Sequence, residues 1–148
     1  MSDRVLVDTN VLVYAYDRAA PVKQKKALEV LDWLVATSLG VLSTQVLAEF
    51  FVTVTNKITE PLPADEAESR VHNLARSWPV IEVTAMIILE AARGVRVHRF
   101  SYWDAQIWAT AKLNQIPVVL SEDFSDGQIT EAIRFMNPFS AKFQLSST

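Results

Sequence analysis

The sequence has no cysteine and only three glycines among its 148 residues. The absence of cysteine excludes disulfides, thiolate metal sites and a cysteine nucleophile, and it fits a reducing cytoplasm. The scarcity of glycine leaves no glycine-rich phosphate-binding loop. The two histidines, His72 and His98, do not support a histidine-rich zinc site. Each of these chemistries is therefore set aside.

Positive charge and long apolar runs are also scarce. The net charge is -3 and the sequence pI is near 5.4, so nucleic acid could be bound only through a local basic patch. No apolar run approaches the ~20 residues of a membrane span, and Met1–Val5 does not open an apolar signal-peptide core. Because half of the residues are hydrophobic, we expect one folded cytoplasmic domain over residues 1–148.

Short apolar runs alternate along the chain with helical patterns. Strands are expected at about residues 4–7, 41–43, 80–83 and 116–120, and an edge strand at 132–136. Helices are expected at about residues 9–17, 21–39, 44–57, 64–77, 84–94 and 101–114, with a basic connection over residues 95–100. This alternation predicts an α/β fold in which helices cover both faces of a mostly parallel sheet.

Two acids follow predicted strands. Asp8 stands directly after the first apolar run, and Asp123 comes shortly after the run that ends at residue 120. In open parallel sheets the ligand crevice lies beyond the carboxyl ends of the strands, so both acids are expected at one edge. Simpler explanations exist, since Asp8 could be a helix N-cap and Asp123 part of an Asx turn before Gly127. Glu122 and Asp126 are close enough in sequence to replace Asp123.

Two further acids fall inside predicted helices. On a helical wheel Asp104 lies within an apolar arc, which favours a functional role because a buried charge needs a partner. The arc consists of Trp103, Ile107, Trp108 and Ala111, with Gln106 and Thr110 on the other side. Asp104 also stands three residues after Ser101, as in a capping box. Glu49 falls on the flank of its helix's apolar stripe, where a solvated glutamate is the commoner case.

Taken together, the four acids suggest a metal site. Carboxylates ~4 Å apart repel by about 1 to 4 kcal/mol per pair, a sizeable cost against a folding stability of about 5–15 kcal/mol. A divalent cation would neutralise such a cluster, and hard oxygen ligands select Mg²⁺ or Mn²⁺. A site of this kind activates water and stabilises the charge that develops on a phosphodiester during displacement.

Four segments, in order, resemble the motifs of PIN-domain ribonucleases, especially the VapC toxins of toxin–antitoxin pairs. They are Val7-Asp8-Thr9-Asn10-Val11-Leu12, Ser43-Thr44-Gln45-Val46-Leu47-Ala48-Glu49-Phe50, Ser101-Tyr102-Trp103-Asp104-Ala105, and Leu120-Ser121-Glu122-Asp123-Phe124 with the later Asp126-Gly127 and Asn137-Pro138-Phe139. Phe124 stands where a leucine is common. The resemblance spans nearly the whole chain.

This resemblance implies a PIN-like three-layer α/β/α domain with endoribonuclease activity dependent on Mg²⁺ or Mn²⁺. It also implies a homodimer that a cognate antitoxin holds inactive. By motif position, the catalytic and metal-binding acids are Asp8, Glu49, Asp104 and Asp123. Asn10 and Ser121 would support them through hydrogen bonds.

Basic residues that could guide RNA are few. Arg93, Arg96 and Arg99 are the leading candidates because they come just before Asp104, and a second patch comprises Lys23, Lys25 and Lys26. An ordinary solvated surface explains both groups equally well.

Two other function classes are alternatives to a nuclease. A haloacid-dehalogenase-like phosphatase would need an aspartate where Asn10 stands, and a receiver domain would need a lysine within residues 120–128, where there is none. A regulatory RNA- or protein-binding module would keep the acids for structure alone. Its signature would be RNA binding without metal-dependent cleavage.

Overall fold

A computed structural model describes residues 3–145 of the chain. Its centre is a six-stranded sheet in the order β3-β2-β1-β4-β6-β5. The strands are β1 (Val5–Val7), β2 (Gly40–Ser43), β3 (Val80–Ile81), β4 (Val118–Leu120), β5 (Ile129–Thr130) and β6 (Ile133–Met136). All neighbouring strands are parallel except β5 and β6. The predicted mostly parallel α/β fold is therefore confirmed.

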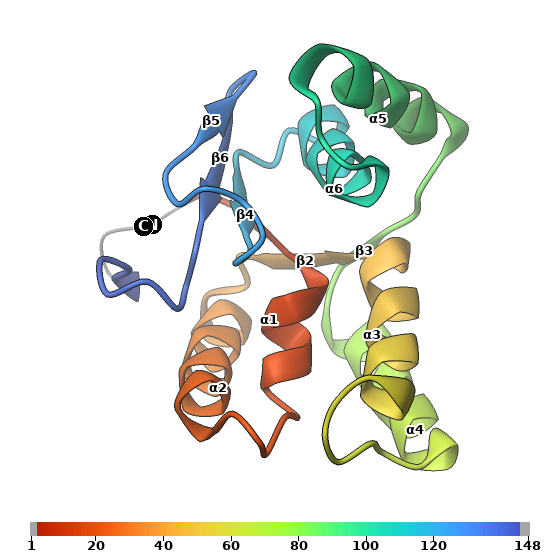
Figure 1. Ribbon diagram of the computed structural model, residues 1–148, viewed down its shortest axis with the longest axis vertical. Helices are drawn as coiled ribbons and strands as arrows, with labels where there is room; N and C mark the ends of the chain where they lie inside the picture. Colours follow the sequence, from red (N-terminus) through yellow and green to blue (C-terminus); the bar gives the residue numbers. More distant parts are fainter. Residues whose placement is uncertain (1–2, 146–148) are drawn as a thin grey trace.

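Helices cover both faces of this sheet. They are α1 (Thr9–Tyr14), α2 (Pro21–Thr37), α3 (Thr44–Asn56), α4 (Ala64–Ser77), α5 (Ala85–His98) and α6 (Tyr102–Leu113). The first four lie on one side of the sheet, while α5 and α6 pack together on the other (Figure 1). The result is a three-layer α/β/α domain. No helix among residues 3–145 is long and apolar enough to cross a membrane.

The two central strands deliver chain segments to the same edge. β1 and β4 are fully buried and pair in register, with Val7 opposite Leu120. Their apolar, mostly β-branched residues suit strands that are covered on both faces. Asp8 continues this pairing, because its N–H donates to the carbonyl of Leu120 at 2.9 Å. Asp8 and Ser121 therefore leave the sheet side by side.

Helix caps determine where several helices begin. The side chains of Asp8, Ser43, Thr84 and Ser101 each accept a hydrogen bond from an N–H in the first turn of the following helix. These bonds satisfy donors that have no partner inside a helix. Two of these caps involve the candidate acids. Asp8 is itself a candidate acid, and Ser101 caps the helix whose first turn contains Asp104.

The last strand was wrongly expected at the edge. β6 lies between β4 and β5, and its residue Phe135 is fully buried. After β4 the chain turns through Gly127, whose φ of +83° favours glycine, and then forms β5 as the true edge strand. β5 has only two residues, the exposed Ile129 and the buried Thr130, too few to give an apolar pattern in the sequence.

The expected connection over residues 95–100 was also wrong. α5 continues through Gly94 to His98 and ends with Arg99 in the left-handed conformation at φ 62°. Gly94 has a packing role instead, because a Cβ there would lie 2.8 Å from the ring of Trp108 on α6. This glycine permits the close approach of α5 and α6 and does not end the helix.

Candidate functional site

Asp8 lies at the centre of the site. Its side chain is only 4% exposed. Its Oδ1 accepts a hydrogen bond from the Thr9 N–H at 2.7 Å, and its Oδ2 accepts one from the Ser121 hydroxyl at 2.7 Å. A buried carboxylate needs such donors, and both come from the segments that leave β1 and β4.

Asn10 and Ser121 tie the two strand ends together. The side-chain amide of Asn10 lies 3.1 Å from the Ser121 hydroxyl oxygen and 3.1 Å from Oδ2 of Asp123. The side-chain oxygen Oδ1 of Asn10 accepts from the Glu122 N–H at 3.2 Å, and the Ser121 hydroxyl accepts from the Asp123 N–H at 3.0 Å. Asn10 therefore donates to the carboxylate of Asp123, as Ser121 does to that of Asp8.

The geometry separates Asp123 from its two acidic neighbours. Glu122 accepts hydrogen bonds from the Tyr14 hydroxyl at 2.6 Å and from Lys23 at 2.8 Å. Asp126 accepts from the Asn137 N–H at 2.9 Å. Among these three acids, Asp123 is the one that Asn10 joins to the Asp8 cluster.

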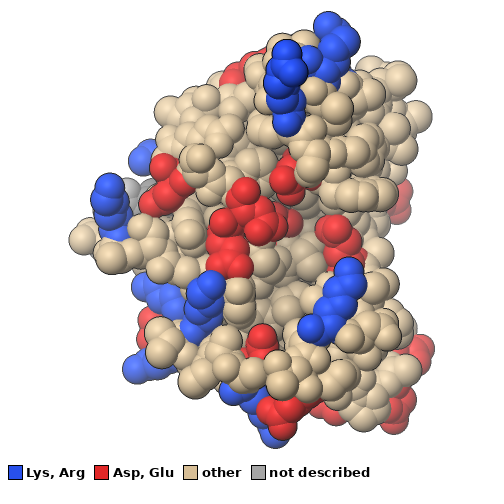
Figure 2. Space-filling model, viewed as in Figure 1, with Lys and Arg blue, Asp and Glu red and all other residues tan. Residues whose placement is uncertain are grey.

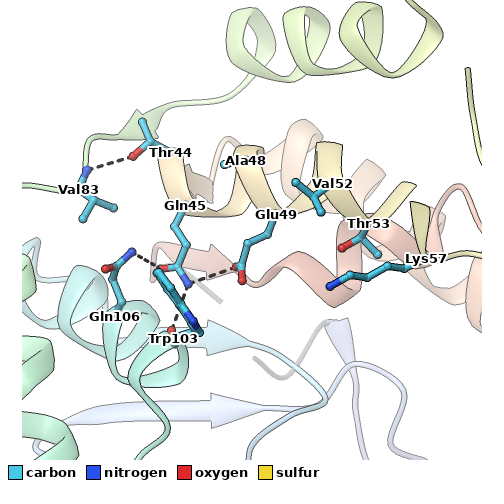
Figure 3. A pocket seen from close by; sticks show the side chains of 10 residues that line it. All are labelled: Thr44, Gln45, Ala48, Glu49, Val52, Thr53, Lys57, Val83, Trp103 and Gln106. Atoms are coloured by element: carbon cyan, nitrogen blue, oxygen red, sulfur yellow. Dashed lines mark hydrogen bonds between the residues drawn. The ribbon is translucent and has the colours of Figure 1, made fainter. Parts of the chain in front are cut away.

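Glu49 reaches the cluster from α3. Its Oε1 accepts from the Thr9 hydroxyl at 3.0 Å and from the side-chain amide of Gln45 at 3.2 Å. Gln45 also donates to the carbonyl of Trp103 and accepts from Gln106 at 2.9 Å (Figure 3). This chain of amides was not predicted from the sequence. The i, i+4 spacing of Gln45 and Glu49 could have indicated its first link, but no local pattern indicates Gln106.

Asp104 is half-buried in the first turn of α6. Its N–H donates to the Ser101 hydroxyl at 3.4 Å, so the capping geometry is present. The expected arc was wrong in part, because Ile107, Trp108 and Ala111 are buried whereas Trp103 is 60% exposed. The opposite side of α6, with Gln106, is buried too. α6 lies between α5 and the sheet, so a helical wheel cannot separate its faces.

The acids interact electrostatically. Burial is the largest cause that raises the pKa of Asp8, to about 7, and the charges of Asp123 and Glu49 raise it further. Hydrogen bonds from Ser121 and Thr9 act in the opposite direction. Burial also raises the pKa of Asp104, with a smaller contribution from Asp123. In Figure 2 acidic side chains gather in a central hollow between the two groups of helices.

The donor set suits a hard cation by its chemistry. Four carboxylates offer only oxygen ligands, and Mg²⁺ and Mn²⁺ prefer oxygen. As the side chains stand, however, residues 3–145 contain no group of three acidic or histidine side chains close enough to hold a metal ion. The four acids therefore interact electrostatically but would have to move closer together to bind an ion; they are Asp8, Glu49, Asp104 and Asp123.

The candidate RNA-guiding arginines differ from one another. Arg93 is paired with Glu90 at 2.7 Å and with Glu131 at 2.7 Å, in a network that also includes Lys112 and His98. Arg96 and Arg99 are exposed. In the second patch Lys23 is paired with Glu122, Lys25 is exposed and Lys26 lies over the ring of Phe143.

The fold and the site together define an α/β protein with a carboxylate cluster at the carboxyl edge of a parallel sheet. The family model described as "PIN domain" matches residues 5–125 of this sequence. The chain therefore belongs to the PIN domain family. A comparison with curated protein sequences found no match.

Several solved structures share the fold at low sequence identity. A toxin–antitoxin complex from Klebsiella pneumoniae aligns with TM-score 0.66 and 17% identity, covering 91% of this chain and 98% of that one. VapC20 of Mycobacterium tuberculosis, described as a sarcin-ricin loop cleaving toxin, aligns with TM-score 0.61 and 18% identity over 78% of this chain and 86% of its own. VapBC2 from Rickettsia felis, bound to a promoter DNA fragment, gives TM-score 0.65 and 14% identity over 90% and 97%.

Proposed function

We propose that this protein is a divalent-metal-dependent endoribonuclease and the toxin of a VapBC-type toxin–antitoxin pair. The observation that carries the proposal is the buried carboxyl group of Asp8. Its burial and the charges of Asp123 and Glu49 all disfavour its ionised form. Clustered acids whose burial and mutual repulsion disfavour ionisation are typical of sites that bind a cation. Membership of the PIN family and the fold shared with VapC20 support the same reading.

The four acids would hold the ion in the proposed site. When bound, Mg²⁺ or Mn²⁺ supplies an activated water and neutralises charge on the phosphodiester that is cut. Ser121 holds the carboxylate of Asp8 and Asn10 holds that of Asp123, so that both carboxylates stay at the edge of the sheet. Because the pKa of Asp8 is about 7, its carboxyl must lose a proton before it can act as a ligand at neutral pH.

The proposed partner is an antitoxin protein. The structures from Klebsiella pneumoniae and Rickettsia felis are complexes of toxin with antitoxin, and the chain covers nearly the full length of each aligned protein. We extend the partner to this chain on that likeness and on the resemblance of its motifs. A homodimer and a cytoplasmic location, both expected from the sequence, belong to the same proposal.

Cleavage of RNA by purified, partner-free protein tests the proposal. A panel of structured RNAs is incubated with Mg²⁺, Mn²⁺ or EDTA, using the natural sequence and the variants Asp104→Asn and Asp32→Asn. Asp32 is exposed on α2 and serves as the matched acid outside the cluster. We expect metal-dependent cutting that Asp104→Asn abolishes and Asp32→Asn retains. Equal cutting by folded Asp104→Asn, or cutting in EDTA, would contradict the assignment.

One observation favours a second candidate, a non-catalytic RNA- or protein-binding PIN module. The described residues bring no three acids within metal-holding distance of one another. Such a module would bind RNA and cut none of the panel with either metal, although its acids are intact. A phosphatase-type site gains nothing from the geometry, because the amide of Asn10 bonds to Asp123 and Ser121 in the position where that class needs a second aspartate.

A further inference from the structure

A hollow of about 440 Å³ lies directly beside the acid cluster, between α3 and α6. Glu49 belongs to both the hollow and the cluster, and Trp103 on its opposite wall precedes Asp104 in the chain. We call it the Trp103 pocket; it is lined by Thr44, Gln45, Ala48, Glu49, Val52, Thr53, Lys57, Val83, Trp103 and Gln106 (Figure 3). A molecule held at the acids would therefore extend into this pocket.

Trp103 is unusual for its exposure. All four tryptophans lie in the described part of the chain; Trp78 and Trp108 are buried, Trp33 is partly covered and Trp103 is 60% exposed. Its ring stands edge-on to Tyr102 with centroids 5.0 Å apart. The Trp103 carbonyl accepts from Gln45 at 3.1 Å. A large flat ring is thus anchored through its backbone and left open to solvent beside the acids.

The other walls of the pocket are better suited to packing against the flat face of a ring than to forming hydrogen bonds with its polar edge. The amides of Gln45 and Gln106 bond to each other, and the Thr44 hydroxyl accepts from the Val83 N–H. These polar groups are therefore engaged in holding α3, α6 and the strand end together. Lys57 stands at the far end of the pocket and is the cation among its lining residues (Figure 3).

We propose that the Trp103 pocket binds one unpaired nucleobase of the RNA, stacked on the indole of Trp103, while the adjoining phosphodiester lies at the acids. This rests on the proposed function, since it takes RNA as the substrate. Base–aromatic stacking tolerates any base, so the pocket selects for an unpaired nucleotide and hardly for its identity. Lys57 would contact a neighbouring phosphate. Continuity with the acids and a cation at the rim favour RNA here over a protein segment.

RNA binding without cleavage tests the pocket. Each protein carries Asp104→Asn to prevent cutting, and binding of short fluorescein-labelled single-stranded RNA is measured by anisotropy in Mg²⁺. Adding Trp103→Ala should weaken binding roughly 5- to 150-fold, the usual effect of losing one stacked base. Trp103→Phe should retain most of the affinity, and Lys57→Ala should flatten the salt dependence. Leu89→Ala, an equally exposed apolar side chain on α5 at 65%, should change nothing.

A second measurement isolates the stack. Single abasic positions are moved along the RNA, and one position should weaken binding to the Trp103 protein yet have no further effect on Trp103→Ala, as residues in direct contact show non-additive effects. If the natural protein cuts no RNA but these effects appear, the pocket stands and the nuclease proposal fails. If it cuts RNA and folded Trp103→Ala binds and cuts it equally well, the pocket proposal is overturned. Absence of any RNA binding overturns it as well.

Discussion

The hydroxyl of Ser121 donates to Oδ2 of Asp8 at 2.7 Å and joins two residues that are 113 positions apart. This bond favours the ionised form of Asp8, against the burial that disfavours it. The chemistry of the site therefore depends on a residue that need not contact RNA or metal. Replacing Ser121 removes the hydrogen bond that supports the Asp8 carboxylate and leaves the carboxylate itself in place, so the effect of the support can be measured alone.

Ser121→Ala should reduce metal affinity and cleavage by roughly 10- to 100-fold, as is usual when a group that orients a ligand is removed. Loss of the bond also raises the pKa of Asp8, so the acidic limb of the pH–rate profile should move to higher pH. Metal titrations at several pH values measure both effects. Ser125→Ala, at an exposed serine of the same loop, is the control. An unchanged profile in Ser121→Ala would refute the supporting role.

The stability of the metal-free protein should fall as pH rises. The pKa of Asp8 is raised in the folded state, to about 7, above its value in the unfolded chain. The contribution of Asp8 to the free energy of unfolding is therefore fully present below pH ~4. It is lost as the pH rises through about 7, and the total loss is up to about 4 kcal/mol. Urea denaturation from pH 4 to 8 measures this loss. Asp8→Asn should flatten the curve, and Asp32→Asn should not.

Metal addition gives the complementary result. A cation that binds the ionised cluster stabilises the folded state more where Asp8 is already ionised. Saturating Mg²⁺ should therefore raise the melting temperature more at pH 8 than at pH 5. An equal rise at both pH values would contradict the place of Asp8 in the proposed metal site.

The arginines in α5 and at its C-terminal cap should fall into two groups. Removing Arg96 and Arg99 together should weaken RNA binding and reduce the slope of log affinity against log salt by about 1.4, if each contacts one phosphate of a single strand. Arg93→Ala should instead lower thermal stability, because it leaves Glu90 and Glu131 without one of their partners. Binding that is unchanged at every salt concentration in the double variant would show these residues to be ordinary surface.

Gly40→Ala should destabilise the fold. A Cβ at this position would lie 2.1 Å from a ring carbon of Trp78, a side chain that is 8% exposed. Overpacking of this kind costs about 1–3 kcal/mol, which urea denaturation can measure. Trp78→Phe in the same protein should recover part of the loss, since the smaller ring makes room. A Gly40→Ala protein of natural stability would show that Trp78 moves aside freely.

Much of the acid cluster was accessible from the sequence because it depends on local pattern and one general rule. Asp8 follows a buried strand, Asp123 follows another, and parallel strands bring their carboxyl ends to one edge. The motif resemblance names Asp123, but the residues alone leave Glu122 and Asp126 as alternatives to it. The choice among them depends on contacts with Asn10, Lys23 and Asn137, which the chain order does not reveal.

The errors share a physical cause. A helical wheel gives the faces of α6 but not the elements that cover them, so it places Trp103 on the core side and Gln106 on the other side. The local pattern predicts a helix stop at Gly94, whereas a glycine is needed there because the ring of Trp108 on another helix lies so close. In each case a tertiary contact overrides a local tendency, and single-sequence patterns carry no information about such contacts.

The pairing of β1 with β4 has a consequence for protein synthesis. Ser121, the partner of Asp8, and the neighbouring Asp123 emerge from the ribosome more than a hundred residues after Asp8. Since domains fold as units during synthesis, the nascent chain cannot complete the acid cluster until most of it has been translated. The nuclease proposed above would therefore be inert while it is being made. Chains that terminate before residue 121 lack both Ser121 and Asp123.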